Sequence, residues 1–168
     1  KQRRISKNLN QTESVKKSTG LTLRFPSAYR VAKVDSSFVW IRKDIETGSV
    51  NLFVCRYNDE YRRKVVDIRD SISKKHIPGP IEDSYMSTDL MYEPNTEEIS
   101  IRGKQLLETR GLWEIQGQFM AGPFLNHLLK IDTDKNEYIM LDGFVYSPGS
   151  NKRDYVFELE AIMRSLKY

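Results

Sequence analysis

The segment Asp132-Thr133-Asp134-Lys135-Asn136 carries oxygen-bearing side chains at alternating positions, as the first half of an EF-hand calcium loop does. That loop also needs Gly at its sixth position and a bidentate Glu at its twelfth. Here the sixth position is Glu137 and the twelfth is Gly143, so both requirements fail. The segment therefore predicts a turn between two strands, and we expect no metal site there.

The histidines and the single cysteine lack the spacing of a zinc site or of a catalytic thiol. His76 and His127 are 51 residues apart, and no second histidine or cysteine lies at a ligand spacing from either. Cys55 ends the apolar run 50–55, which is typical of a small buried side chain. The alternation of His127 with Leu125 and Leu129 places it on one face of a strand.

Motifs for nucleophilic catalysis or for phosphate binding are also missing from the sequence. It contains no Gly-x-Ser-x-Gly elbow, no Gly-x-x-x-x-Gly-Lys loop and no Gly-x-Gly-x-x-Gly fingerprint. We therefore predict no catalytic residue and no cofactor, and expect that the chain is not an enzyme.

Charged and aromatic residues on predicted strands are the remaining candidates for function. Alternation along residues 104–116 places Glu108 and Arg110 on one strand face and Trp113 on the other. Glu108 and Arg110 could be an exposed ion pair that adds little stability, or a recognition patch. Core packing is the default for a tryptophan, but an exposed one beside an arginine would indicate a contact surface. We predict an interaction surface, with the loop 80–97, from Trp40, Arg42, Glu108, Arg110, Trp113 and Phe124.

The elements that would position these residues follow from the spacing of apolar side chains. Alternation predicts strands over residues 21–25, 29–34, 38–43, 98–102, 104–116, 124–131 and 137–146. Residues 50–57 carry apolar side chains at both odd and even positions, which predicts a central strand covered on both faces. Residues 80–97 show no clear period and predict a long loop.

Two helices are predicted in the body of the chain. Tyr61, Val65, Ile68 and Ile72 form one apolar stripe, with Asn58 or Asp59 as the cap and His76 near the end. Asn151 is predicted to cap a second helix over residues 152–166. Short connections favour antiparallel pairing. The predicted fold is α+β, an antiparallel sheet of five to seven strands with helices packed on it, as two layers or an αβα sandwich.

The net charge of +4 lies mainly in an N-terminal arm. Residues 1–17 hold six basic residues and one acidic residue, which gives +5, whereas the rest holds 21 basic and 22 acidic residues, which gives −1. A nucleic-acid interface needs a concentrated basic surface, so we expect none. We divide the chain into a basic leader with a partial helix over residues 1–19 and one domain over 20–168.

Several motifs resemble a known family when they are taken together. They are Glu108-Thr-Arg110-Gly111-Leu112-Trp113, Phe119-Met120-Ala-Gly122-Pro123-Phe124, Asp142-Gly143-Phe144-Val145-Tyr146-Ser-Pro148 and Asn151-Lys152-Arg153-Asp154-Tyr155, with Phe38-Val-Trp40-Ile-Arg42 and Pro78-Gly79-Pro80 upstream. In this order and spacing they resemble a bacterial envelope lipoprotein family known only as a domain of unknown function (number forty-eight thirty-seven). The order of elements also looks like the Mog1/PsbP-like fold, an analogy that does not determine function.

The resemblance implies a periplasm-facing lipoprotein of the cell envelope, tethered through an N-terminal lipid and preceded by an N-terminal half that this chain lacks. It supplies no catalytic residue. We therefore expect a non-catalytic module that binds an envelope protein or another envelope component. The alternatives are a small-ligand-binding or enzymatic domain completed by that N-terminal half, and an oligomerisation domain, for which an apolar exposed sheet face would be the sign.

Overall fold

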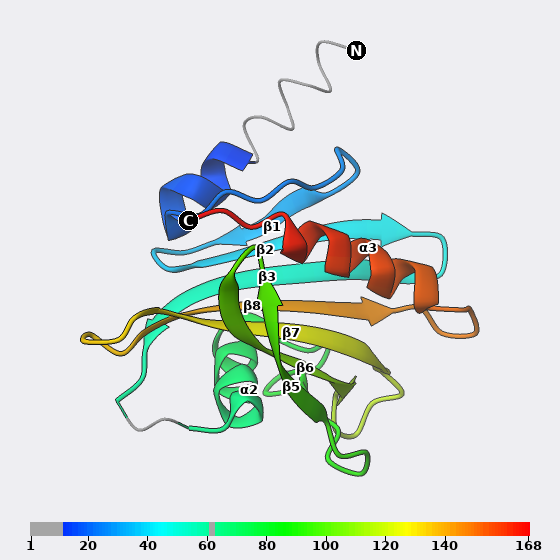
Figure 1. Cartoon of the computed structure of the whole chain (residues 1–168). Coiled ribbons are helices and arrows are strands. Elements are labelled where there is room, and N and C mark those ends of the chain that lie inside the picture. The colour runs from blue at the N-terminus through cyan, green and yellow to red at the C-terminus, as the bar shows by residue number, and fades with distance from the viewer. Residues whose placement is uncertain (1–11, 61–62) are drawn as a thin grey trace.

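In the computed structural model, residues 12–60 and 63–168 are described, and they form an eight-stranded antiparallel sheet (Figure 1). The spatial order is β1-β2-β3-β8-β7-β6, and both β4 and β5 pair with the outer edge of β6. The strands are β1 (Arg30–Val34), β2 (Phe38–Ile45), β3 (Gly48–Asn58), β4 (Ser87–Thr88), β5 (Asn95–Ile101), β6 (Lys104–Glu114), β7 (Ala121–Asp132) and β8 (Glu137–Tyr146).

The predicted α+β class with an antiparallel sheet is confirmed, with corrections to the number of strands. Eight strands are present within the described ranges where five to seven were predicted, because the expected loop 80–97 contains β4 and the start of β5. The predicted strand over residues 21–25 is wrong: only Thr22 bridges, to Lys167. Leu21, Leu23 and Phe25 are buried, so their alternation reflected packing and not pairing in the sheet.

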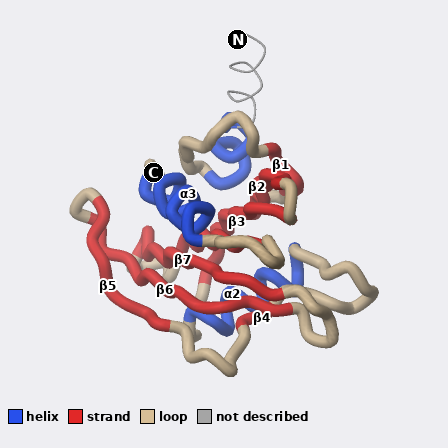
Figure 2. Tube along the Cα trace, turned by 90° about the vertical axis from the view of Figure 1, so that its right-hand side faces the viewer, coloured by secondary structure: helices blue, strands red, loops and turns tan. Residues whose placement is uncertain are grey.

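The sheet is strongly curled rather than flat. Figure 1 shows the β5–β6 hairpin running at a steep angle across β7 and β8, and Figure 2 shows it from the side. Twist between neighbouring strands accumulates across a wide sheet and produces such curvature. The curl gives the sheet two different faces, and each is covered by a different helix.

Alternation along the central strands divides the core between these two faces. On β8, Ile139, Leu141 and Val145 pack with α3 (Arg153–Arg164), whereas Met140 and Phe144 pack with α2 (Val65–His76). Strand β3 divides in the same way. This agrees with the prediction of a central strand covered on both sides, and Figure 2 shows the two helices on opposite sides of β6 and β7.

The helix α2 begins later than the sequence predicted. Its first residue is Val65, its N-cap is Lys64 without a side-chain cap bond, and Tyr61 lies outside the described residues. Asp59 does not cap the helix. It is buried, and its Oδ2 accepts a hydrogen bond from the backbone N–H of Arg63 at 3.0 Å. At α3 the N-cap is Lys152, without a side-chain cap bond, and not Asn151 as predicted. Asn151 lies one residue earlier, where its Oδ1 accepts a hydrogen bond from the backbone N–H of Arg153 at 3.0 Å.

A helical segment over residues 12–19 packs on the α3 side of the sheet. Val15 within it is fully buried, and the Oγ1 of Thr19 donates a hydrogen bond to the carbonyl of Val15 at 2.7 Å. The part of the predicted basic leader before residue 12 lies outside the described residues. The predicted boundary near residue 20 therefore follows a segment that contributes to the core.

Candidate functional site

An aromatic cleft of about 340 Å³ opens on the α2 face of the sheet. Its aromatic lining residues are Trp40 on β2, Trp113 on β6, and Phe144 and Tyr146 on β8. The segment after α2 supplies the opposite wall through Ile77, Pro78 and Pro80, and Met86 and Met120 complete the apolar lining. Trp40 and Tyr146 are half-buried, whereas Trp113 and Phe144 are buried and form the floor.

The polar atoms in this cleft are largely satisfied within the protein. Trp40 Nε1 donates to Asn51 Oδ1 at 3.1 Å, and Asn51 Nδ2 donates to Ser49 Oγ at 3.0 Å. Trp113 Nε1 donates to the carbonyl of Val145 at 3.1 Å. The indole rings therefore present apolar faces. Among the described residues that line the cleft, Arg42 alone is charged.

Trp113 reaches its position because residue 122 has no side chain. A Cβ atom at Gly122 would lie 2.0 Å from the carbonyl oxygen of Val145 and 3.0 Å from Trp113 Nε1. Gly122 pairs with Trp113 across β6 and β7. The indole and the neighbouring strand therefore occupy the space that any larger residue would need, which explains a glycine within a central strand.

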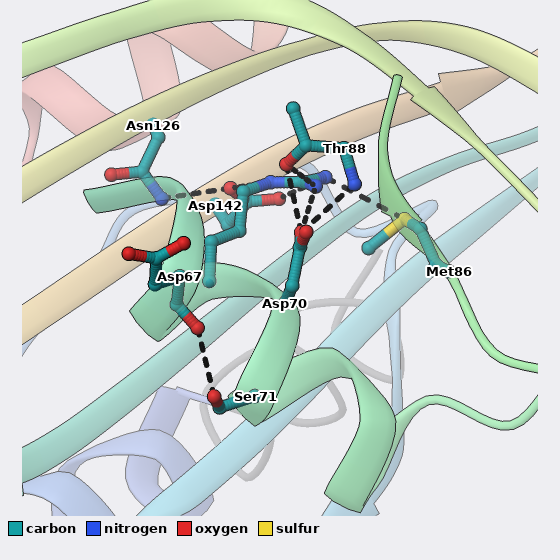
Figure 3. A network of polar contacts seen from close by, with 8 residues as sticks. Asp67, Asp70, Ser71, Met86, Thr88, Asn126 and Asp142 are labelled. Atoms are coloured by element: carbon teal, nitrogen blue, oxygen red, sulfur yellow. Dashed lines mark hydrogen bonds and ion pairs between the residues drawn. The ribbon is translucent and has the colours of Figure 1, made fainter. Parts of the chain in front are cut away.

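A buried polar network lies beneath the aromatic cleft and joins α2 to the sheet (Figure 3). Arg69 Nε donates to Asp142 Oδ2 at 2.7 Å and Arg69 Nη2 donates to Asp142 Oδ1 at 3.2 Å, a bidentate ion pair. Both side chains have no solvent exposure. Asn126 Nδ2 donates a further hydrogen bond to Asp142 Oδ2 at 2.8 Å. We call Arg69, Asp142, Asn126, Asp70 and Thr88 the arginine frame.

The arginine frame also holds β4 against the helix. Arg69 Nη1 donates to Thr88 Oγ1 at 3.2 Å, and Asp70 Oδ1 accepts hydrogen bonds from the backbone N–H and the Oγ1 of Thr88 at 2.9 and 2.7 Å. The Arg69 guanidinium also stacks on the ring of Phe124, with its Cζ 3.9 Å from the ring centroid. The Arg69 side chain thus connects α2 with β4, β7 and β8.

Burial and contacts with neighbouring side chains have opposite effects on the pKa of Asp142. Its complete burial raises the pKa of the carboxyl, and the Arg69 guanidinium and the Asn126 amide lower it. A buried ion pair adds little net stability compared with apolar residues of similar size, but losing one partner is very costly. The main effect of the arginine frame is therefore to fix α2 in one position on the sheet, and its net contribution to stability is small.

The arginine frame and the aromatic cleft share their supporting residues. Met86 lines the cleft, and its Sδ lies 3.6 Å from Arg69 Nη2. Phe144, on the cleft floor, follows Asp142 by two residues on the same face of β8. The position of α2 also determines where Ile77 to Pro80 run, so the wall of the cleft is fixed by the network below it.

Glu108 and Arg110 lie on the opposite face of the sheet, against α3. Arg110 donates to Glu108 Oε1 at 2.9 Å and to Glu160 Oε2 at 3.2 Å. Glu108 Oε2 also lies 2.8 Å from Nε2 of the buried His127, its direct partner in the β6–β7 register. Burial lowers the pKa of His127, and its hydrogen bond with Glu108 acts in the opposite direction.

The six residues predicted as one interaction surface are therefore separated by the sheet. The structure brings together Trp40, Arg42 and Trp113 in the aromatic cleft, with Phe124 packed beneath it on Arg69. Trp113 and Phe124 are 2% exposed, so they support the site but do not offer a surface. Glu108 and Arg110 share one face of β6, as the alternation along residues 104–116 predicted, and the structure places that face against α3.

The residues of the candidate site that the sequence interpretation missed are Arg69, Asn126 and Asp142. A signal for them existed: each is a polar residue within an otherwise apolar stripe or strand, and buried polar residues need partners. Arg69 lies four residues after Val65 and three before Ile72, inside the buried stripe of α2. Asp142 lies in the buried run 139–145 of β8.

The other residues considered for chemistry are explained by packing and turns. Burial raises the pKa of Cys55 to about 11, so its thiol is protonated at neutral pH. The segment 132–136 is the turn between β7 and β8, where Asp132 Oδ1 accepts hydrogen bonds from the backbone N–H groups of Asp134 and Lys135 at 3.0 and 3.2 Å. Within residues 12–60 and 63–168, no group of three or more His, Cys, Asp or Glu residues is placed to hold a metal ion.

The fold and site define an α+β domain with a curled antiparallel sheet and an aromatic cleft on one face. The family model described as "Domain of unknown function (DUF4837)" matches residues 8–165, and the chain belongs to that family. The search of curated proteins finds no match. In the described part of the chain, no helix combines the length and the hydropathy needed to cross a membrane.

Proposed function

We propose that this domain is a non-catalytic binding module of the bacterial cell envelope, and that its aromatic cleft binds an apolar segment of an envelope protein. The cleft itself carries the proposal, because it is concave and aromatic and its polar atoms are largely satisfied internally. Such a lining favours an inserted apolar side chain over a polar substrate. Arg42 Nε donates to Asp44 Oδ1 at 2.8 Å, and we expect its other N–H groups to meet a carbonyl or carboxylate of the bound segment.

The arginine frame supports this proposal by making the cleft rigid. A site that is already formed loses less conformational entropy on binding than one that must order itself. Four aromatic residues and two prolines restrict motion around the opening, and the bidentate pair Arg69–Asp142 holds the helix behind one wall. The cleft is therefore suited to one partner of defined shape.

The envelope location and the lipid tether in this proposal rest on the resemblance of the family motifs to envelope lipoproteins, and the Mog1/PsbP-like fold remains an analogy. Cell fractionation tests the location independently of binding. Recovery of the full-length protein with the membrane fraction, and its release by removal of the lipidated N-terminus, would support the envelope placement. Recovery in the cytosol would contradict the proposed envelope location and would leave the proposed binding cleft unaffected.

Changing residues of the cleft walls is expected to weaken binding of the partner strongly. The experiment captures envelope proteins on immobilised wild-type protein and on two variants, Trp40→Ala and Pro80→Asp. The first removes an aromatic wall, and the second places a charge on an exposed wall residue with little effect on the fold. We expect each variant to lower the recovery of the partner by about tenfold or more, since cleft contacts of this kind are worth 1.4 kcal/mol or more.

The matched control is Phe157→Ala, which removes an exposed ring (52% exposed) from α3 on the opposite face. This variant is expected to recover the partner as the wild type does. Urea denaturation of all three variants verifies that each is folded. Equal recovery by Trp40→Ala, Pro80→Asp and Phe157→Ala would show that the aromatic cleft is not the binding site.

A further inference from the structure

A second, smaller pocket of about 170 Å³ lies on the α3 face, behind the sheet from the aromatic cleft. We call it the basic pocket. Its floor is apolar, and its members belong to the α3-side core: Ile101, Leu106, Leu129, Met163 and Leu166. These residues come from β5, β6, β7, α3 and the segment after α3, so the tertiary fold assembles the pocket.

Four of the other lining residues are basic, and Tyr168 and the buried His127 complete the lining. Arg102 lies in the β5–β6 turn, Lys104 is the first residue of β6, and Arg164 and Lys167 come from the end of α3 and the residues after it. No acidic residue in the described part of the chain lines the pocket. Arg164 pairs with Glu160 at 2.9 Å, whereas Arg102, Lys104 and Lys167 make no ion pair with any described residue.

The nearby acidic side chains are already engaged by other cations. Glu108 pairs with Arg110 and contacts His127, and Glu160 pairs with both Arg110 and Arg164. These contacts neutralise the acids where the pocket meets α3 and β6. The ammonium group of Lys104 is 3.2 Å from the centroid of the Tyr168 ring, which holds the end of this side chain at the rim.

The size of the pocket and its division into an apolar floor and a cationic rim select one class of ligand. A cavity of about 150 Å³ with an apolar lining accepts a ligand the size of benzene, so the floor can receive one ring or a short alkyl chain. A cationic rim favours a negative group, and the apolar floor disfavours a fully hydrated anion. We propose that the basic pocket binds an apolar carboxylate, with its hydrocarbon part on the floor and its carboxylate at Lys104 and Lys167.

An apolar carboxylate can be a free acid or the C-terminal residue of a peptide, and the two share this chemistry. The probes are phenylacetate and the peptide Gly-Gly-Phe, each compared with its neutral amide. Calorimetric titration of the whole chain at low ionic strength is expected to show saturable binding of at least one carboxylate, with its amide about tenfold weaker or more. Preference for phenylacetate or for the peptide distinguishes the two sources.

The double variant Lys104→Gln/Lys167→Gln removes the two rim charges and keeps the apolar floor. We expect it to weaken carboxylate binding by about tenfold or more and to leave amide binding unchanged. Two controls are expected to bind as the wild type does: Lys74→Gln, whose lysine also lies over a tyrosine ring, and Trp40→Ala in the aromatic cleft.

Four results would overturn the assignment. The first three are the absence of saturable binding by either carboxylate, equal affinity for the carboxylate and its amide, and equal affinity of the double variant and Lys74→Gln. Loss of binding in Trp40→Ala alone would also overturn it, because the carboxylate would then occupy the aromatic cleft. Partner capture by the aromatic cleft is measured separately, so either proposal can fail alone.

Discussion

Replacing Asp142 with leucine is expected to lower the free energy of unfolding by about 3–5 kcal/mol. The substitution leaves the Arg69 guanidinium fully buried without its bidentate partner and leaves Asn126 Nδ2 without its acceptor. Water cannot reach the guanidinium in the folded state. Among the described residues, its remaining ionic contact is the longer one of Nη1 with Asp70 Oδ1 at 3.4 Å, so the poorly compensated charge destabilises that state alone. Urea denaturation followed by tryptophan fluorescence measures the loss, since Trp113 lies in the same core.

The double variant Arg69→Met/Asp142→Leu separates the ion pair from the packing around it. Apolar replacement of a whole buried pair is often close to neutral, so the double variant is expected to be more stable than Asp142→Leu alone. Arg69→Met alone should also be destabilised, because Asp142 then keeps only the amide of Asn126. A double variant whose loss equals the sum of the two single losses would show that Arg69 and Asp142 do not act as a pair.

Replacing Gly122 with alanine is expected to cost about 3 kcal/mol or more, beyond the usual range for overpacking. The new Cβ would lie 2.0 Å from the carbonyl oxygen of Val145, which belongs to the backbone of a central strand and has little room to move. The indole of Trp113, whose Nε1 donates to this same oxygen, would also be displaced. The variant should therefore lose stability and, in addition, the floor of the aromatic cleft.

The control for this substitution is Gly117→Ala in the turn between β6 and β7. Gly117 has a φ of 75°, and a Cβ there would meet no atom within 4 Å. Its replacement costs only the left-handed backbone strain, about 1 kcal/mol. Urea denaturation of both variants gives the comparison. If Gly122→Ala were no less stable than Gly117→Ala, the close approach of β7 to Val145 would not constrain the fold.

The parts of the fold that sequence patterns predicted are those that depend on local periodicity. Alternation placed Trp113 and Arg110 on opposite faces of one strand, and the apolar run 50–57 indicated a central strand, as observed in β3. The predicted start of α2 was wrong because the apolar stripe begins at Tyr61, four residues before the first helical residue, Val65. Local spacing cannot show that the Asp59 carboxylate binds the N–H of Arg63 outside the helix.

The candidate site was only partly predictable because it depends on contacts between distant segments. The sequence does not indicate that Trp40 and Trp113 line one cleft, because the strand order and the curl of the sheet bring them together. The pairing of Glu108 with His127 depends likewise on the β6–β7 register. The arginine frame could have been suspected from polar residues in buried runs, but its partners could not be assigned without the fold.

Site-specific photo-crosslinking from the aromatic cleft, in cells that produce the full-length protein, is the most direct test of partner binding there. The crosslinking residue replaces Met120 on the cleft wall, or Phe157 on the opposite face. If the cleft binds the partner, we expect a discrete partner adduct from position 120, lost when Pro80→Asp is added, and no such adduct from position 157. Adducts that are equal at both positions, or that persist with Pro80→Asp, would contradict the binding role of the aromatic cleft.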